Sequence, residues 1–440
     1  MNFFLGFFLS CLAVVVEAAD LSSILNDAYK NDPTYLEAEA NFNALKEAYP
    51  QALANVLPNL SFVANAATSN IDVGFIKGGG NALVSPGTQN YSSQTYTVNL
   101  TQPIFNFSYF SQVKQANQQV KQATADFFAA KQDLILRTSQ AYFAVLSAQD
   151  AYAFALANKS DLENQLKETK ARFSSGLETK AGIDAAQAAY DGSLALEIST
   201  RYDVENTKAA LRVLTGYDIQ RINSLNNRKL ALLMPAPLNV ETWIQKSNQQ
   251  NLTLQSARFA MMAAREEVKV NVSGHLPTVN LVGDYTKQTG NFFGAINYDG
   301  GTVGVQLAVP IYSGGEVNSQ VRQAKFRYLQ ASQKVEKAYR DTFVSARQNF
   351  NNVISDISKV KADQQSLLSS QSALSSMKAS YKMGTRTITD VLSSIKEVYA
   401  AKQGLAEDTY TYILDTLSLK KEVGILSNKD IDALNEWLGG

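Results

Sequence analysis

The chain has 440 residues, and its 40 Lys and Arg side chains balance its 40 Asp and Glu side chains. This balance excludes the strongly basic field that would attract nucleic acid or anionic lipid. A single histidine and a single cysteine leave no cluster with metal-ligand spacing. The one triple-glycine segment, residues 78–80, is not followed by the Lys-Ser/Thr of a phosphate loop. We therefore predict no catalytic, cofactor-binding or metal-binding residues, and we expect that the chain is not an enzyme.

The N-terminus begins with an apolar stretch over residues 3–16, followed by the small residues Val16 and Ala18. This pattern predicts a signal peptide over residues 1–18 and export of the rest of the chain. The stretch is too short for a membrane anchor, and Cys11 lies too early for a lipoprotein signal. Beyond it no run of ~18 apolar residues could form a membrane helix, so any insertion into a bilayer would have to use β-strands.

Three sequence anchors occur twice in the same order, at an offset of roughly 210 residues, which indicates an internally duplicated protomer. Residues 102–105 (QPIF) match 309–312 (VPIY), residues 56–60 match 275–279, and residues 173–177 match 381–385. We predict a first repeat over 19–215, a linker over 216–238, a second repeat over 239–425 and a C-terminal segment over 426–440.

Each copy contains a proline-free tract of about 130 residues, where long helices can run without the cost of an internal proline. The tract after Pro310 has small or apolar residues that alternate in steps of four and three, which is typical of a heptad seam. The seam breaks near Thr342 and then resumes, like a stutter in a coiled coil. Its members are Val317, Val321, Ala324, Tyr328, Ala331, Val335 and Ala338, then Ala346, Phe350, Val353, Ile357 and Val360. An ordinary elongated coiled coil is the alternative reading.

Strands are predicted before each helical tract, because apolar and polar residues alternate there with a period of two. Partner strands follow Pro58 and Pro277, with loops expected over residues 74–91 and 288–301. Runs of about ten residues with one apolar face are typical of a transmembrane β-barrel, although a soluble hairpin has the same periodicity. The expected lipid-facing residues are Tyr96, Val98, Leu100, Val303, Val305 and Leu307, and the expected lumen-facing residues are Thr97, Asn99 and Gln306.

Four strands per chain cannot close a barrel, since roughly eight is the practical minimum. Open strand edges are not tolerated in lipid. We therefore expect several copies to pool their strands in one barrel, in contact with outer-membrane lipid. An enzyme barrel or a surface receptor would have no need of long duplicated helices, which favours a passive duct. A simple coiled-coil tether would have no use for lipid-facing strands.

Five segments form a recognisable set: Gly274-His275-Leu276-Pro277-Thr278, residues 309–315 (VPIYSGG), residues 317–321 (VNSQV), Phe350-Asn351-Asn352 and residues 384–388 (GTRTI). Together they resemble the TolC family of outer-membrane efflux and type I secretion channels. The resemblance implies a mixed α+β, mostly α homotrimer: a twelve-stranded transmembrane β-barrel continuous with a twelve-helix periplasmic α-barrel. Residues 219–238 and 428–438 would form an equatorial belt around it.

The resemblance also implies partners and a location. These are a periplasmic adaptor (membrane fusion) protein and an inner-membrane transporter of the RND, ABC or MFS class, with no nucleic acid. The channel would lie in the Gram-negative outer membrane with a periplasmic extension, would need no cofactor and would open at its periplasmic end. Drugs and secreted proteins are both expected as substrates, and the choice between them stays open.

In that family a Tyr and an Arg near the second helix–helix turn hold the periplasmic end closed. The matching residues are Tyr381 and Arg386, and Asp390 matches an Asp that lines the constriction. A second Asp one helical turn further on is replaced by Ser393. The resemblance therefore predicts one acidic ring rather than two.

The first copy departs from the family at the position where an Asp is expected, which is Gly182, with Asp184 two residues later. Glu168 stands where the family has a polar partner for the Arg, and it could form a charge-assisted pair with Arg386. We therefore include Glu168 and Asp184 in the predicted gate, and the partner of Tyr381 stays open.

The turns around Gly176 and Leu177 and around Gly384 and Thr385 are the predicted adaptor-docking tips, since they are small-residue turns at the ends of the coiled coils. The alternative is that the two glycines only relieve backbone strain.

Overall fold

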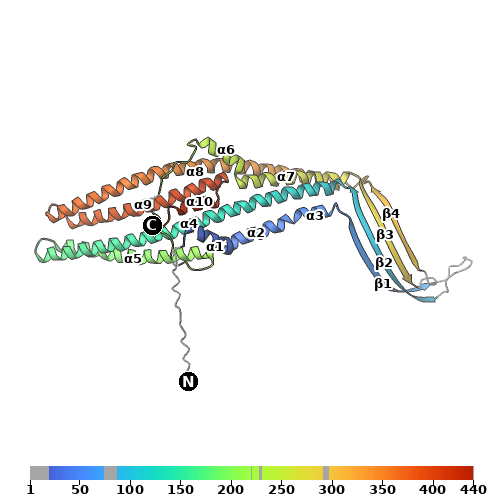
Figure 1. Ribbon diagram of the computed structural model, residues 1–440, viewed down its shortest axis with the longest axis horizontal. Coiled ribbons are helices and arrows are strands. Elements are labelled where there is room, and N and C mark those ends of the chain that lie inside the picture. Colours follow the sequence, from blue (N-terminus) through green and yellow to red (C-terminus); the bar gives the residue numbers. More distant parts are fainter. Residues whose placement is uncertain (1–18, 74–86, 220, 227–229, 291–296, 440) are drawn as a thin grey trace, which may run out of the picture. The chain divides into compact units, whose positions relative to one another are not determined.

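The computed structural model describes residues 19–439 except 74–86, 220, 227–229 and 291–296 (Figure 1). The predicted signal peptide, most of the first predicted strand loop and residues 291–296 of the second lie outside the described residues. The predicted loop bounds are too wide, because residues 87–91, 288–290 and 298–301 belong to strands. Of the helices in the described ranges, none is both long and apolar enough to cross a membrane. The chain divides into two compact units, and each is taken in turn below.

One unit, residues 41–125 and 255–338, contains a four-stranded antiparallel sheet in the order β1-β2-β3-β4. Adjacent strands of the sheet lie side by side in Figure 1. Apart from one irregularity between Pro103 and Phe105, the pairing register is regular. The strands are β1 (Asn59–Val73), β2 (Gly87–Phe105), β3 (Thr278–Gly290) and β4 (Tyr298–Ala308).

The register of the sheet places residues of one kind together in two neighbouring rows. One row is mostly apolar and the next row is polar, because neighbouring strands place directly paired residues on the same face. These two rows contrast as the alternation predicted, whereas other rows are mixed: Tyr96 pairs with Lys287, and Gln102 pairs with Leu281. The apolar row is Leu60, Leu100, Gly283 and Val303, and the polar row is Ser61, Asn99, Asp284 and Thr302.

Two long helices follow the two strand pairs, and each is followed by a shorter helix. α4 (Phe107–Ser174) has 68 residues and α8 (Glu316–Lys382) has 67, while α5 (Lys180–Thr215) and α9 (Ile388–Val423) have 36 each. The order strand, strand, long helix, shorter helix thus occurs twice. α8 runs through Thr342 without interruption, so the stutter changes the seam and does not break the helix.

The other unit, residues 19–40, 126–254 and 339–439 of the described chain, has its core where α4, α5, α8 and α9 meet the short terminal helices. Tyr142, Phe143 and Tyr412 are the largest of the fully buried side chains in this core, each 2 % exposed or less. The segment after α5 pairs with both ends of the chain, through the bridges Ala19–Ile222 and Leu225–Leu438. The remaining helices are α1 (Leu21–Asn31), α2 (Pro33–Lys46), α3 (Ala48–Ala54), α6 (Val240–Gln250), α7 (Leu252–Val272), the short 3-10 helix η1 (Ser273–His275) and α10 (Asn428–Asn435).

Candidate functional site

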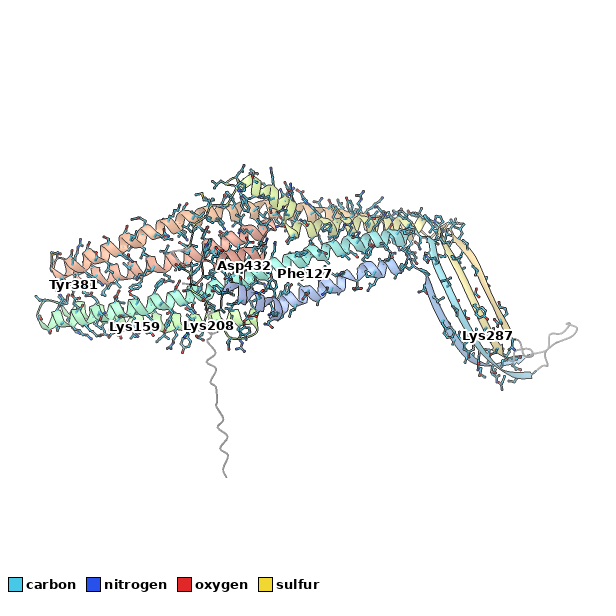
Figure 2. All side chains as sticks on the ribbon, viewed as in Figure 1. Phe127, Lys159, Lys208, Lys287, Tyr381 and Asp432 are labelled. Atoms are coloured by element: carbon cyan, nitrogen blue, oxygen red, sulfur yellow. The ribbon has the colours of Figure 1, made fainter. Side chains whose placement is uncertain are left out.

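The candidate site lies at the two turns that join α4 to α5 and α8 to α9. Both turns have the same local design. Gly176 and Gly384 have φ of +73° and +75°, a conformation that favours glycine. Thr179 and Thr387 then cap α5 and α9 with their side chains. Figure 2 labels Tyr381, which lies at the turn end of α8.

Tyr381 is the central side chain of this site. It is buried, with 3 % of its surface exposed, in a small core cluster formed by residues of both helix pairs, including Leu166 and Ile388. Its hydroxyl donates a 2.8 Å hydrogen bond to Oε2 of Glu178. The guanidinium of Arg172 lies 4.7 Å from the centre of its ring, which is cation–π geometry. Tyr381 therefore joins the α8–α9 turn to the α4–α5 turn within one chain.

Glu178 uses both carboxylate oxygens. Its Oε1 accepts hydrogen bonds from the backbone N–H of Thr179 at 2.9 Å and from the Thr179 hydroxyl at 3.3 Å. Partial burial opposes ionisation, but the hydrogen bonds from Thr179 and Tyr381 outweigh it and hold the pKa of Glu178 below its usual value. Burial, and then the hydrogen bond to Glu178, raise the pKa of Tyr381. At neutral pH the pair is thus a neutral phenol that donates to a carboxylate.

Two of the predicted gate residues, Arg386 and Asp390, lie near each other in the second turn. Asp390 forms a capping box with Thr387, whose N–H and hydroxyl donate to Oδ2 of Asp390 at 3.0 and 2.9 Å. These bonds, and more weakly the charge of Arg386, lower the pKa of Asp390. Arg386 is exposed and has no hydrogen bond or ion pair to another residue of the described chain.

The other two predicted gate residues, Asp184 and Glu168, form no hydrogen bond or ion pair with the described Tyr381, Arg386 or Asp390. Asp184 is 61 % exposed and pairs with Lys180 on its own helix at 2.7 Å. Glu168 is half-buried on α4 and forms no hydrogen bond or ion pair with any described residue. The pair of Glu168 with Arg386 is therefore not formed within one chain, and the acidic partner of Tyr381 is Glu178 instead.

Sequence reasoning missed Glu178 and Arg172. The internal duplication could have identified Glu178. The repeated segment 173–177 ends one residue before it, so extending the alignment by one residue places Glu178 opposite Arg386, a predicted gate residue. Tyr381 matches Phe173 at an offset of 381 − 173 = 208, and the same offset matches Arg386 with Glu178. The two copies thus carry opposite charges at equivalent positions of their turns. Arg172 had no comparable signal, since its counterpart is Ser380.

The predicted docking tips are exposed. Leu177 of the first turn is 66 % exposed, and Met383 of the second turn is 73 % exposed. The hydroxyl of Thr385 donates to the carbonyl of Ser380 at 3.0 Å, which tightens the second turn. Both tips therefore present an apolar side chain on a rigid turn.

Comparisons with known proteins identify the class. The family model described as "Outer membrane efflux protein" matches residues 24–217 and 243–424. The chain is 34 % identical over 435 residues to the outer membrane protein TolC of Vibrio cholerae serotype O1, covering 98 % of this chain and 96 % of that protein. It is 26 % identical over 435 residues to the alkaline protease secretion protein AprF of Pseudomonas aeruginosa, covering 98 % and 90 %. The crystal structure of the outer membrane protein VceC of Vibrio cholerae has the same fold, with a TM-score of 0.77 at 19 % identity over 92 % of this chain and 96 % of that one.

These matches define an outer-membrane channel protein rather than an enzyme. The chain belongs to the outer membrane efflux protein family, with TolC-like relatives along nearly its whole length. The predicted family, the predicted outer-membrane location and the predicted non-enzymatic channel class are thereby confirmed. The mostly helical protomer with long helices and antiparallel strands is confirmed as well.

Proposed function

We propose that this protein is a homotrimeric exit duct that carries solutes across the Gram-negative outer membrane and opens at its periplasmic end. The observation that carries the proposal is the sheet of four strands, whose outer strands β1 and β4 each pair on one side only within the described residues. A lipid-embedded sheet cannot leave such edges open. Three copies would supply twelve strands and remove every edge, and their long helices would form the periplasmic tunnel.

Further parts of the proposal rest on the sequence and the family. We propose that residues 1–18 are a signal peptide, that 19–215 and 239–425 are structural repeats, and that 216–238 and 426–440 form the equatorial belt. The family model matches in two segments, and the segment after α5 pairs with both chain ends; both observations support these boundaries.

The partners would be a periplasmic adaptor, docked on the tips at Gly176, Leu177, Gly384 and Thr385, and an inner-membrane RND, ABC or MFS transporter. The exposed apolar side chains of the tips support this docking mode. We propose export of drugs and/or secreted proteins. The name of the AprF relative refers to secretion of a protease, which supports the second class of substrate.

The periplasmic gate would consist of Tyr381, Arg386 and Asp390, with Glu168 and Asp184 as candidate partners on the first helix pair. Three Asp390 carboxylates, one per protomer, would form a ring that favours cations. The side chain of Glu168 forms no hydrogen bond or ion pair with a described residue, so a bond to Arg386 of a neighbouring protomer is the arrangement that we propose for it.

Two measurements test the proposal. Native mass determination in detergent should give a trimer, and a monomer with a folded barrel would contradict the architecture. Single-channel recording in planar bilayers should show low conductance with cation preference. The double variant Tyr381→Phe, Arg386→Ser should raise conductance several-fold without changing the trimer, whereas unchanged conductance would place the constriction elsewhere along the tunnel.

A further inference from the structure

We propose that Glu178 is the positioning residue that keeps the two helix pairs of each protomer together at the tip, because one carboxylate both caps α5 and accepts the Tyr381 hydroxyl. This inference rests on the proposed function, since it assigns to the proposed gate a bond that must break when the tip opens. We call this Tyr381–Glu178 hydrogen bond the latch. The two turns of the same chain differ in the residue that binds the capping threonine.

In each turn a carboxylate accepts hydrogen bonds from the N–H and the hydroxyl of the capping threonine, but a different residue supplies that carboxylate. In the second turn, the acid that receives the Thr387 N–H and hydroxyl is Asp390, the third residue of α9. Its counterpart in the first turn is Gly182, since 390 − 208 = 182, and a glycine has no side chain to offer. The corresponding two donors of Thr179 are instead taken by Glu178, which lies just before the cap.

The structure shows that Glu178 occupies the space that a side chain at position 182 would need. A Cβ built on Gly182 would lie 2.5 Å from Oε1 of Glu178, a distance that real Cβ atoms do not show. The glycine therefore leaves room for the Glu178 carboxylate to fold back over the first turn of α5. Any larger residue at 182 would displace that carboxylate.

The two capping acids, Asp390 and Glu178, differ in whether they also bond the other helix pair. Asp390 hydrogen-bonds only Thr387 among the residues the structure describes, so its carboxylate serves α9 alone. Glu178 lies outside α5, one residue before the N-cap Thr179. Its second oxygen, Oε2, accepts a 2.8 Å hydrogen bond from the hydroxyl of Tyr381 at the other turn. The guanidinium of Arg172 lies over the Tyr381 ring. The acid of the first turn thus bonds to the second helix pair, whereas the acid of the second turn forms no bond to the first helix pair within the described residues.

The position of this bond makes it a latch. One partner belongs to the turn between α4 and α5, and the other belongs to the end of α8. Any movement that separates the two helix pairs at this end must break the bond. The buried ring of Tyr381 would then lose a charge-assisted hydrogen bond, which is roughly twice as strong as a neutral one.

The experiment is a set of variants recorded as single channels in planar bilayers, each first shown to be a trimer by native mass measurement. Glu178→Ala should raise conductance several-fold, whereas Glu178→Gln keeps an acceptor for Tyr381 and should raise it less. Thr179→Ala is the matched control, because it removes the capping hydroxyl and its 3.3 Å bond to Glu178, while the backbone N–H of residue 179 and the Tyr381 hydroxyl still bind the carboxylate. If Thr179→Ala opened the channel as far as Glu178→Ala does, the effect would be helix capping and the latch would be refuted.

A double-mutant comparison separates the latch from a general loosening of the tip. Tyr381→Phe and Glu178→Ala remove the same bond, so the double variant should conduct no more than the more open single variant. Additive increases would overturn the inference. If Glu178→Ala conducts like the unmodified protein while Tyr381→Phe, Arg386→Ser opens the channel, the latch fails and the proposed gate stands. If neither changes conductance, the proposed gate itself is wrong.

Discussion

The hydroxyl of Tyr410 on α9 donates a 2.6 Å hydrogen bond to the carboxylate of Asp150 on α4. Tyr399 of the same helix bonds Asp161 of α4 in the same way, at 2.8 Å. Burial raises the pKa of Asp150 and, together with the nearby carboxylate, that of Tyr410. Together with the Tyr381–Glu178 bond, these bonds join tyrosines of the second helix pair to acids of the first helix pair at three positions along the helices.

Tyr410→Phe should destabilise the protein by about 1–3 kcal/mol, because it leaves the partly buried Asp150 carboxylate without its donor. The measurement is thermal unfolding followed by helical circular dichroism. Tyr202→Phe on α5 is the matched control, since its side chain is 58 % exposed and has no hydrogen bond within the described chain. Equal shifts in the two variants would mean that the hydroxyl of Tyr410 contributes nothing specific.

Much of this fold could be predicted from local pattern, because strand alternation and proline-free heptads are local properties. The two faces of the sheet, for example, follow from residues such as Val98 and Asn99. The closure of the tip could not be predicted this way. It depends on Glu178 folding back over Gly182, a contact that no periodicity encodes. The same applies to Tyr399 and Asp161, which are 238 residues apart in sequence.

The strand faces give a prediction about membrane exposure. Val305 is 66 % exposed on its strand, and Gln306 lies on the opposite face. Val305→Arg should cost about 2–4 kcal/mol near the middle of the bilayer, whereas Gln306→Arg should mainly change conductance. Labelling of single cysteines at the two positions checks the assignment. A water-soluble reagent that marked position 305 and spared 306 would show that the faces are reversed.

The docking tips can be tested without straining the turn. Any bulky residue at Gly176 or Gly384 would be strained by the positive φ, so a loss of efflux there would have two explanations. Leu177→Asp avoids this ambiguity, because it places a charge on an exposed apolar contact without changing the backbone. It should reduce adaptor cross-linking and efflux severalfold while the trimer stays intact. Leu177→Met is the control, and full efflux in Leu177→Asp would exclude the first tip as a docking contact.

The last prediction concerns pH and arises from two pairs of acids along α8 and α9. Asp356 interacts with Asp415, and Asp363, seven residues later on α8, interacts with Asp408, seven residues earlier on α9. The charged groups that act on Asp356 are Asp415, Asp408 and Lys359, and Lys359 is already paired with Asp408 at 2.6 Å. Burial, followed by the charge of Asp415, raises the pKa of Asp356 to about 6.

The sign of the effect follows from linkage. A carboxyl whose pKa is higher in the folded state binds its proton more tightly there than in the unfolded chain. Ionised Asp356 therefore destabilises the fold fully above pH 6, and the penalty disappears as the pH falls from about 6 to about 4. Asp356→Asn should thus stabilise the protein at pH 8 by about 1 kcal/mol, a value reduced for solvent screening because the side chain is partly exposed.

Thermal unfolding at pH 8 and pH 4 tests this prediction. The Asp356→Asn variant should melt at a higher temperature than the unmodified protein at pH 8, and the difference should vanish near pH 4. Glu407→Gln, which removes an exposed charge of α9, should show no comparable pH-dependent difference. If Asp356→Asn instead lowered the melting temperature at pH 8, the carboxylate would be a stabilising group at that pH, and the repulsion assigned to the Asp356–Asp415 pair would be wrong.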